Sequence, residues 1–372
     1  MFDHLVQNSH DLERLCQHLR NEPWIALDTE FVRERTYYAR LCLIQLAAPS
    51  VVACVDPLTL ESLEPLLQVL YTPTIVKVLH AARQDLELFY DLRSAPPAPV
   101  HDTQIAAALL GYQDQISYAA LVEDLLGIKL EKHYTRTDWS RRPLSAAQLR
   151  YAEEDVRYLC NIYPVLMQRL IARGRHEWLV EECARLTDTH LYRNDPDNAH
   201  VRIKQRHALA PVGQQVLRAL ARWRELTAQE LNRPRNWIMR DAELLELARQ
   251  QPRNESELAG VRGVAPSSAK KWGATLVAEI TKAVALTPTR LWKVSAPLNA
   301  RQLSLYERMY KLVHARARER QLSPTLIAGR KDLQALVRGE SADTLLTGWR
   351  RAIIGEELIA MCKRELPCAD SS

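Results

Sequence analysis

The chain has 372 residues, which is long enough for two or three domains, and its hydrophobic content of 47% is ample for buried cores. No apolar stretch approaches the roughly 18 residues of a membrane span, and residues 1–4 do not begin a secretion signal, so we expect a cytoplasmic protein without membrane association. The seven cysteines include no Cys-x-x-Cys pair, which argues against a zinc or redox site and predicts reduced thiols.

The net charge of +5 conceals two oppositely charged parts. Residues 1–200 carry 20 Lys and Arg against 28 Asp and Glu, a net charge of −8, whereas residues 201–372 carry 30 against 17, a net charge of +13. A basic part is the usual electrostatic footprint of phosphate binding, while an acidic part suits nucleic acid only if its carboxylates hold metal ions. We therefore expect two parts with different tasks.

The first acidic motif ends an apolar run at residues 24–31. Side chains of an extended strand point to the same face at every second residue, so Asp28 and Glu30 should project together. Like charges at a buried strand end repel each other, and a bound divalent cation is the usual compensation. An acidic triplet that merely closes a strand against solvent is the alternative.

A third acid follows a later strand. Apolar runs at residues 41–47 and 51–55 predict two strands that complete a three-stranded meander with the first. After a helical pattern at 60–71, residues 74–79 predict another buried strand, and the helix that follows it carries Asp85 near its start. The alternative for Asp85 is an acid that is simply favoured at a helix N-terminus by the helix dipole.

Residues 129–142 form the basic stretch of this acidic part, after a short helix that Gly127 should end. The stretch contains Lys132, Trp139 and Arg141. Basic and stacking side chains close together suit a single-stranded nucleic acid. An ordinary solvated loop is the competing interpretation.

The next helix has the clearest start in the chain. Ser145 and Gln148 have the spacing of a capping box, and apolar residues follow at helical intervals. Tyr151 and Asp155 are four residues apart, so they lie one turn above the other on the same face. A phenol and a carboxylate stacked beside the sheet are a third candidate for the same site, although an isolated pair of this kind is common on helix surfaces.

The sequence beyond a polar, turn-rich stretch at 194–198 is helical and repeated. Trp237-Ile238 recurs 89 residues later as Leu326-Ile327, and Gly260-Val261-Arg262 recurs 88 residues later as Gly348-Trp349-Arg350. Two copies of one small helical unit explain both matches. The stretch at 194–198 is then the linker that precedes them.

In the first copy, a turn at residues 260–264 precedes a helix that should begin near Pro266. Arg262 lies in the turn, and Lys270 and Lys271 lie in the first turns of the helix. Backbone amides at a helix start can bind a phosphate, and the three basic side chains would add to the attraction. We therefore expect contacts with nucleic-acid phosphates here.

In chain order, Asp-x-Glu on a strand, Asp on a helix and Tyr-x-x-x-Asp on a capped helix resemble the motifs of the DEDD exonucleases, in the subgroup with tyrosine in the last motif. Residues 26–47, 78–87 and 137–159 are similar to segments of the ribonuclease D family, and the helical repeats resemble the HRDC domains of that family. The resemblance implies an α/β exonuclease domain with a mixed, ribonuclease-H-like sheet at 1–205. Two small all-α HRDC-like domains would follow at 210–290 and 295–372, the second of them diverged.

The resemblance also implies the chemistry. Asp28, Glu30, Asp85 and Asp155 would bind two divalent cations, Mg²⁺ or Mn²⁺, and Tyr151 would orient the attacking water. Two such ions stabilise the charge that develops on the attacking and leaving oxygens of a phosphodiester. The implied reaction removes nucleoside 5′-monophosphates from the 3′ end of RNA, with precursor tRNA as the implied partner and no obligate protein partner.

Two alternatives stay open at this point. The same chemistry could act on DNA, because carboxylates do not recognise a 2′-hydroxyl. The chain could also be a nucleic-acid-binding protein whose nuclease fold is idle, although an idle site has no need for five groups that repel each other or demand hydration.

Overall fold

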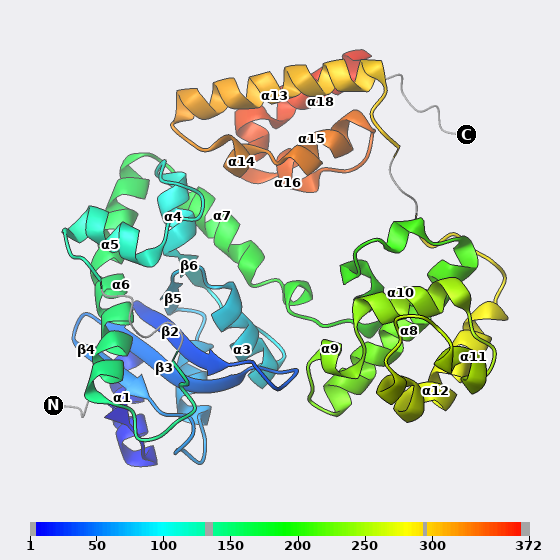
Figure 1. The fold of residues 1–372 in the computed structure, drawn as a ribbon. Helices are drawn as coiled ribbons and strands as arrows, with labels where there is room; N and C mark the ends of the chain where they lie inside the picture. Colours follow the sequence, from blue (N-terminus) through cyan, green and yellow to red (C-terminus); the bar gives the residue numbers. More distant parts are fainter. Residues whose placement is uncertain (1–4, 131–136, 293–295, 366–372) are drawn as a thin grey trace. The chain divides into compact units, whose positions relative to one another are not determined.

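The computed structural model describes residues 5–130, 137–292 and 296–365 (Figure 1). The chain divides into two compact units. The first unit comprises Met1–Val32, Leu41–Tyr192 and Pro297–Ser372, and the second comprises Arg33–Arg40 and Arg193–Ala296. Within the described ranges, none of the helices combines the length and the apolar character that crossing a bilayer requires.

A mixed six-stranded sheet lies at the centre of the first unit, in agreement with the predicted fold class. The strand order is β1-β4-β3-β2-β5-β6; β3 and β4 pair antiparallel, while β1 with β4, β2 with β5, and β5 with β6 pair parallel. Strand β6 was not predicted from the sequence. The bounds are β1 Leu5–Val6, β2 Trp24–Val32, β3 Arg40–Ala48, β4 Val51–Val55, β5 Val76–Leu79 and β6 Val100–Asp102.

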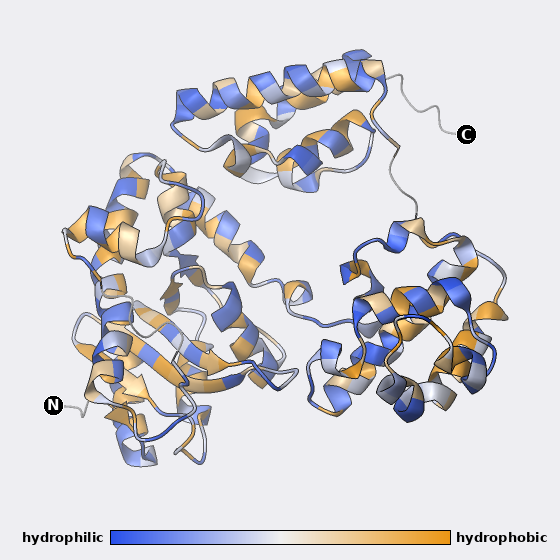
Figure 2. Cartoon of the chain, in the orientation of Figure 1, coloured by the Kyte–Doolittle hydropathy of each residue, from blue (hydrophilic) through white to orange (hydrophobic). Residues whose placement is uncertain are grey.

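Helices cover both faces of this sheet, because alternate residues of the central strands enter different cores. Ala26 of β2 and Val78 of β5 pack with α4 to α7, whereas Ile25 and Leu27 pack with α1 to α3. Figure 2 shows hydrophobic residues along the strands and hydrophilic residues on the outer helix surfaces. The bounds are α1 Ser9–Leu19, α2 Glu64–Leu70, α3 Arg83–Arg93, α4 Thr103–Leu109, α5 Tyr118–Leu126, α6 Ala146–Ala172 and α7 His176–Leu186, followed by a 3₁₀ turn at Thr189–Leu191.

Two predicted helix boundaries are confirmed by their caps. The Ser145 hydroxyl accepts from the backbone N–H of Gln148, and the side chain of Gln148 accepts from the backbone N–H of Ser145, so α6 begins with the expected capping box. Helix α5 ends at Gly127, which adopts a left-handed conformation with φ of 71°.

The second unit is a helical domain that also contains the loop between β2 and β3, Arg33–Arg40. Its core is formed by leucine, valine and alanine side chains of α8, α10 and α12. Part of the predicted linker forms a 3₁₀ helix, η2. The bounds are η2 Pro196–Arg202, η3 Arg206–Ala208, α8 Pro211–Glu230, α9 Arg235–Ile238, α10 Asp241–Gln250, α11 Glu255–Ala259 and α12 Pro266–Val284.

The predicted repeat recurs as the same order of helices. The short helices α9 and α14 begin at Arg235 and Pro324, which are 89 residues apart, and α11 and α16 begin at Glu255 and Asp343, which are 88 apart. The bounds of the second copy are α13 Ala300–Arg320, α14 Pro324–Ile327, α15 Arg330–Val337, α16 Asp343–Leu346, α17 Gly348–Arg350, a π-helical turn at Arg351–Gly355, and α18 Glu356–Glu365.

The second copy belongs to the first unit, and specific contacts attach it to α7. The indoles of Trp349 and Trp178 stack with centroids 4.8 Å apart, and the Arg350 guanidinium forms a paired contact with the Glu182 carboxylate, one bond being 2.9 Å long. Burial of Arg350 and Trp349 makes this copy part of the core of the first unit. The domain boundaries proposed from the sequence remain a prediction.

Candidate active site

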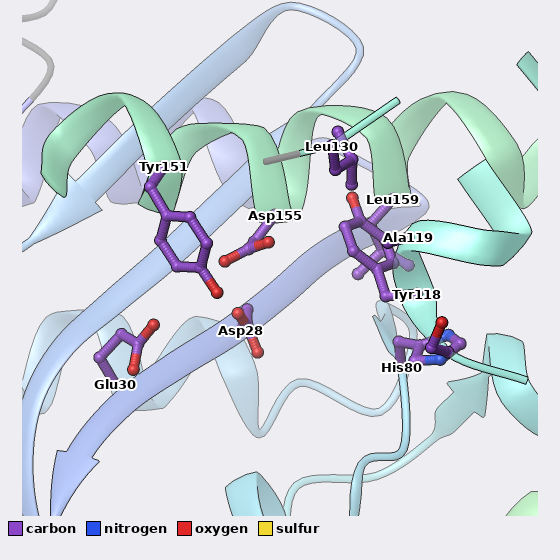
Figure 3. Close-up of a pocket in the computed structure, with 10 residues that line it drawn as sticks. Asp28, Glu30, His80, Tyr118, Ala119, Leu130, Tyr151, Asp155 and Leu159 are labelled. Carbon is purple, nitrogen blue, oxygen red and sulfur yellow. The ribbon is translucent and has the colours of Figure 1, made fainter. Parts of the chain in front are cut away.

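The first acid pair lies within β2, because this strand continues to Val32 instead of ending at the acids. Asp28 and Glu30 point to the sheet face covered by α6 (Figure 3). They line a cavity of about 390 Å³, together with residues from the end of β5, from α5 and its N-cap, and from α6. The lining residues are Asp28, Glu30, His80, Ser117, Tyr118, Ala119, Leu130, Tyr151, Asp155 and Leu159.

Helix α6 contributes Tyr151 and Asp155 from consecutive turns of the face that borders the cavity. The helix packs Ala152 and Val156 into buried cores, and this orientation turns the tyrosine and the aspartate towards the acids of β2. The Tyr151 hydroxyl donates a hydrogen bond to the Asp155 carboxylate. Tyr151 and Asp155 therefore lie together beside the sheet, as their spacing predicts.

Asp85 approaches from the other layer of helices. The last paired residues of β2 and β5 are Ala26 and Val78, two residues before Asp28. Beyond this pair, the first turn of α3 lies next to β2. There the Thr29 hydroxyl donates to the Asp85 carboxylate, which is 7% exposed. Asp85 is outside the cavity lining, yet its negative charge raises the pKa of Asp28.

Burial raises the pKa of all four carboxyl groups, and repulsion from the other acids of the site adds to the shift at Asp28 and Glu30. Burial is the largest cause in each case. It raises the pKa of Glu30 to about 8, with the charges of Asp155 and Asp85 adding to the shift, and the pKa of Asp155 to about 7. The pKa of Asp85 rises to about 6, and that of Asp28 rises well above its ordinary value. The site is therefore strained when all four groups are ionised without a counter-charge.

These four groups suit hard divalent cations. Carboxylate oxygens are the ligands that Mg²⁺ and Mn²⁺ prefer, and four negative charges match two doubly charged ions. Among the described residues, no three Asp, Glu, His or Cys side chains already stand in the arrangement of a formed metal site.

The Tyr151 hydroxyl is held in its protonated form. Burial raises its pKa, and the negative charges of Asp155, Glu30 and Asp28 raise it further. A neutral phenol is both a donor and an acceptor of hydrogen bonds, so it can hold a water molecule but is a poor general base at neutral pH.

His80 and Tyr118 are among the cavity residues that the sequence analysis did not single out. The His80 ring makes contacts of 3.0 Å to Thr103 Oγ1 and 3.1 Å to the carbonyl oxygen of Ile116, and the Tyr118 hydroxyl donates to the Glu154 carbonyl oxygen at 3.0 Å. These bonds fix both rings as one wall of the cavity. The signal for His80 was its position directly after β5, the parallel neighbour of β2.

The three residues of the basic stretch 129–142 that were predicted to bind RNA differ from one another in their surroundings. Trp139 is only 2% exposed and packs among Cys42, Cys54 and Ala152, which argues against stacking of a base on its ring. Its indole instead supports the ring of Tyr151, with centroids 6.1 Å apart. Arg141 is exposed and pairs with Asp138 at 3.1 Å, and Lys132 lies outside the described residues.

The basic residues predicted in the second unit lie on its surface. Arg262, Lys270 and Lys271 are all exposed, and helix α12 begins at Pro266 as expected. The Lys271 ammonium lies 4.5 Å from the centre of the Trp272 ring. Their role in RNA binding stays a prediction.

Comparison with known proteins gives consistent matches for both units. Residues 4–171 match the model of a 3′-5′ exonuclease family, and residues 213–280 match that of the HRDC domain. Ribonuclease D of Granulibacter bethesdensis is 40% identical over 97% of this chain and 93% of its own, and ribonuclease D of Zymomonas mobilis is 39% identical over 97% and 94%. The crystal structure of Escherichia coli RNase D matches with a TM-score of 0.90 and 32% identity, covering 99% of this chain and 100% of that one.

The fold and the acid site define a 3′–5′ exonuclease of the DEDD group, a fold that implies dependence on divalent metal ions. Identity of 35–40% to curated relatives over nearly the whole length then specifies the family further. The chain belongs to the ribonuclease D family, and it is a 3′→5′ exoribonuclease.

The raised pKa values predict that the metal-free protein loses stability as the pH rises. Glu30, Asp155 and Asp85 bind protons more tightly in the folded chain than in the unfolded chain, so the stability that these three groups contribute is full below pH about 4 and is lost as the pH rises through about 6 to 8. Glu30→Gln removes the group with a pKa of about 8 and should raise the melting temperature at pH 8 by about 2–5 °C, with a smaller effect at pH 5.

Melting curves of both proteins in a chelating buffer, at pH 5 and pH 8, provide the measurement. Excess Mn²⁺ at pH 8 should raise the melting temperature of the unaltered protein more than that of Glu30→Gln, because only the former keeps all four carboxylates. If the two proteins differ in melting temperature by the same amount at pH 5 and at pH 8, the assigned ionisation of Glu30 is wrong.

Proposed function

We propose that Asp28, Glu30, Asp85 and Asp155 together hold two divalent cations, Mg²⁺ or Mn²⁺, at the 3′ end of the RNA. Carboxylates of β2 and α6 line one cavity, and the charge of Asp85 on α3 acts on both acids of β2; this arrangement supports the assignment. When bound, the ions supply charge stabilisation for the attacking and leaving oxygens of the phosphodiester. The products are nucleoside 5′-monophosphates.

We also propose that Tyr151 positions the attacking water. Its protonated hydroxyl is already bonded to Asp155 and faces the acids of β2, so a water held between these groups would be oriented towards the scissile phosphate. The indole of Trp139 supports the ring and limits its movement. Tyr118, Leu130 and Leu159 offer an apolar wall for the terminal nucleoside.

For the physiological substrate we propose structured RNA, with precursor tRNA as one member of that class. The support comes from the E. coli relative, which is described as an exoribonuclease involved in structured RNA processing. We further propose a cytoplasmic location, since the six cysteines in the described ranges are all free thiols.

Matched RNA and DNA oligonucleotides with labelled 5′ ends test this function. Incubation with Mg²⁺ or Mn²⁺ should shorten the RNA one nucleotide at a time from its 3′ end and release nucleoside 5′-monophosphates, and a chelator should stop the reaction. Faster digestion of the DNA would favour the alternative substrate. Internal cleavage products would contradict an exonuclease assignment.

A further inference from the structure

The loop between β2 and β3, Arg33–Arg40, is anchored in the second unit by Tyr37. The Tyr37 ring is 8% exposed, its hydroxyl donates to the Glu225 carboxylate, and the Arg235 guanidinium lies 4.6 Å from the ring centre. The backbone N–H of Tyr37 donates to the side-chain oxygen of Asn232 at 3.0 Å. The loop that leaves the catalytic strand is therefore built into the surface of the helical domain.

A cavity of about 330 Å³ lies beside this anchor, and positive charge predominates in it. Four arginines line it, against the two carboxylates of Glu34 and Asp241. The buried carboxylate of Glu225 adds a third negative charge, so four positive charges face three negative ones. The four arginines are Arg33, Arg202, Arg224 and Arg235.

Two of these arginines share one carboxylate, so one of their two positive charges is not neutralised and can attract an anionic ligand. Arg235 binds Glu225 through two contacts of 2.5 and 2.6 Å, and Arg202 reaches the same carboxylate at 3.5 Å. The Arg202 side chain is 52% exposed, so its guanidinium can contact an anion from solvent without leaving Glu225.

An exposed indole stands on the short helix that lines this cavity. Trp237 of α9 is 56% exposed, and the Arg233 guanidinium lies 5.8 Å from the centre of its ring. Asn236 of the same helix lines the cavity and is exposed as well. An exposed aromatic ring with an arginine beside it is an arrangement on which bases of single-stranded nucleic acids stack.

The first residue of the loop is close to the catalytic acids along the chain. Arg33 is three residues beyond Glu30, and β2 is extended up to Val32, which gives a separation of about 10 Å at 3.3 Å per residue. An RNA strand whose 3′ end occupies the acid site therefore needs only a few more nucleotides to reach Arg33.

We propose that Arg33, Arg202, Arg233, Asn236 and Trp237 form a binding surface for single-stranded RNA upstream of the 3′-terminal nucleotide. This surface, the Trp237 patch, would stack one base on the indole and contact phosphates through Arg33 and Arg202. The inference rests on the proposed function, and it assigns a surface of the second unit to the part of the substrate upstream of its 3′ end.

Binding of a 5′-labelled single-stranded RNA of about 12 nucleotides, followed by fluorescence anisotropy, tests the patch. All proteins are full length and carry Asp28→Asn so that the RNA stays intact. Trp237→Ala should weaken binding by about 5- to 100-fold, whereas Trp237→Tyr should retain most of the affinity because a tyrosine ring also stacks. Arg202→Gln should lower the slope of log affinity against log salt by about 1.

Arg222→Gln is the matched control, since Arg222 is also 52% exposed, is also ion-paired, and belongs to the same unit. It should bind RNA as the parent does. If Trp237→Ala and Arg202→Gln both match this control, the patch does not bind RNA. If Trp237→Ala lowers the melting temperature, its weaker binding is not evidence for the patch. The proposal then depends on retained affinity in Trp237→Tyr and a lower salt slope in Arg202→Gln.

Hydrolysis of a dinucleotide separates this inference from the proposed function. A dinucleotide has only one nucleotide besides the 3′-terminal one, so it offers little upstream RNA to the patch. The patch variants with an intact Asp28 should therefore degrade it at the rate of the unaltered protein. A failure of the unaltered protein to degrade any RNA would refute the function itself. Normal degradation with unchanged binding of the longer RNA by the variants would refute only the patch.

Discussion

Asp28→Asn is expected to lower the rate of RNA hydrolysis by about 10³-fold or more, because a metal-bound phosphodiester derives several kcal/mol of transition-state stabilisation from its cations. Asp28 is the central acid of the site: its pKa is raised by the charges of Asp85, Asp155 and Glu30, so it lies within electrostatic reach of all three. Removing its charge should weaken metal binding more than removing a peripheral carboxylate. RNA affinity should stay within about threefold, since the basic surfaces of the second unit are unaltered.

Single-turnover digestion of a 5′-labelled RNA, over a range of Mn²⁺ concentrations, measures this effect. Asparagine has nearly the same shape as aspartate, and the change also relieves repulsion in the metal-free site, so the variant should melt at the same temperature as the unaltered protein or higher. Asp138→Asn is a suitable control, because Asp138 is an exposed carboxylate that pairs with Arg141 outside the cavity. Near-normal turnover of Asp28→Asn at saturating Mn²⁺ would overturn the metal assignment.

Local patterns were sufficient to predict which candidate residues lie on the same face of one strand or helix. The two-residue period of a strand placed Asp28 and Glu30 on one face, and the four-residue spacing on a capped helix did the same for Tyr151 and Asp155. These relations depend on backbone geometry within one element. That these elements come together in one site was inferred from the family resemblance, because a local pattern does not indicate which strand lies beside which helix.

Contacts between distant segments could not be predicted in this way. Trp139 had the composition of a nucleic-acid contact, yet the pocket formed by β3, β4 and α6 buries it. The local pattern of Arg33–Arg40 does not indicate that this loop belongs to the second unit, yet Tyr37 is fixed there by Glu225, which is 188 residues further along the chain. Burial of this kind depends on the tertiary fold, which composition over a short window does not contain.

The two copies of the helical repeat show a similar limit. Their alignment placed Arg262 and Arg350 at equivalent positions, and the same role could be expected for both. In the structure, Arg350 is 8% exposed and paired with Glu182, whereas Arg262 is exposed. The surroundings of each copy, and not the repeated pattern, therefore determine which arginine is available to RNA.

Tyr151→Phe is expected to lower the catalytic rate by about 10- to 1000-fold, the range that a group orienting a proton-bearing reactant contributes. The change removes only the hydroxyl that is bonded to Asp155, while the ring keeps its packing against Trp139. Thermal stability should therefore be retained. The affinity for RNA should hardly change, because the attacking water does not hold the substrate.

The loss of the Tyr151 hydroxyl also has a consequence for Asp155 that separates the two roles of the tyrosine. The hydrogen bond from Tyr151 lowers the pKa of Asp155, against the rise caused by burial, so Tyr151→Phe should raise that pKa further. If the hydroxyl acted only by keeping Asp155 ionised, raising the pH from 7 to 9 would restore the rate of the variant to that of the unaltered protein. If it orients the water, the variant stays slower at every pH. Single-turnover rates of both proteins between pH 6 and 9, at saturating enzyme and Mn²⁺, decide between these results, and equal rates throughout would remove Tyr151 from the mechanism.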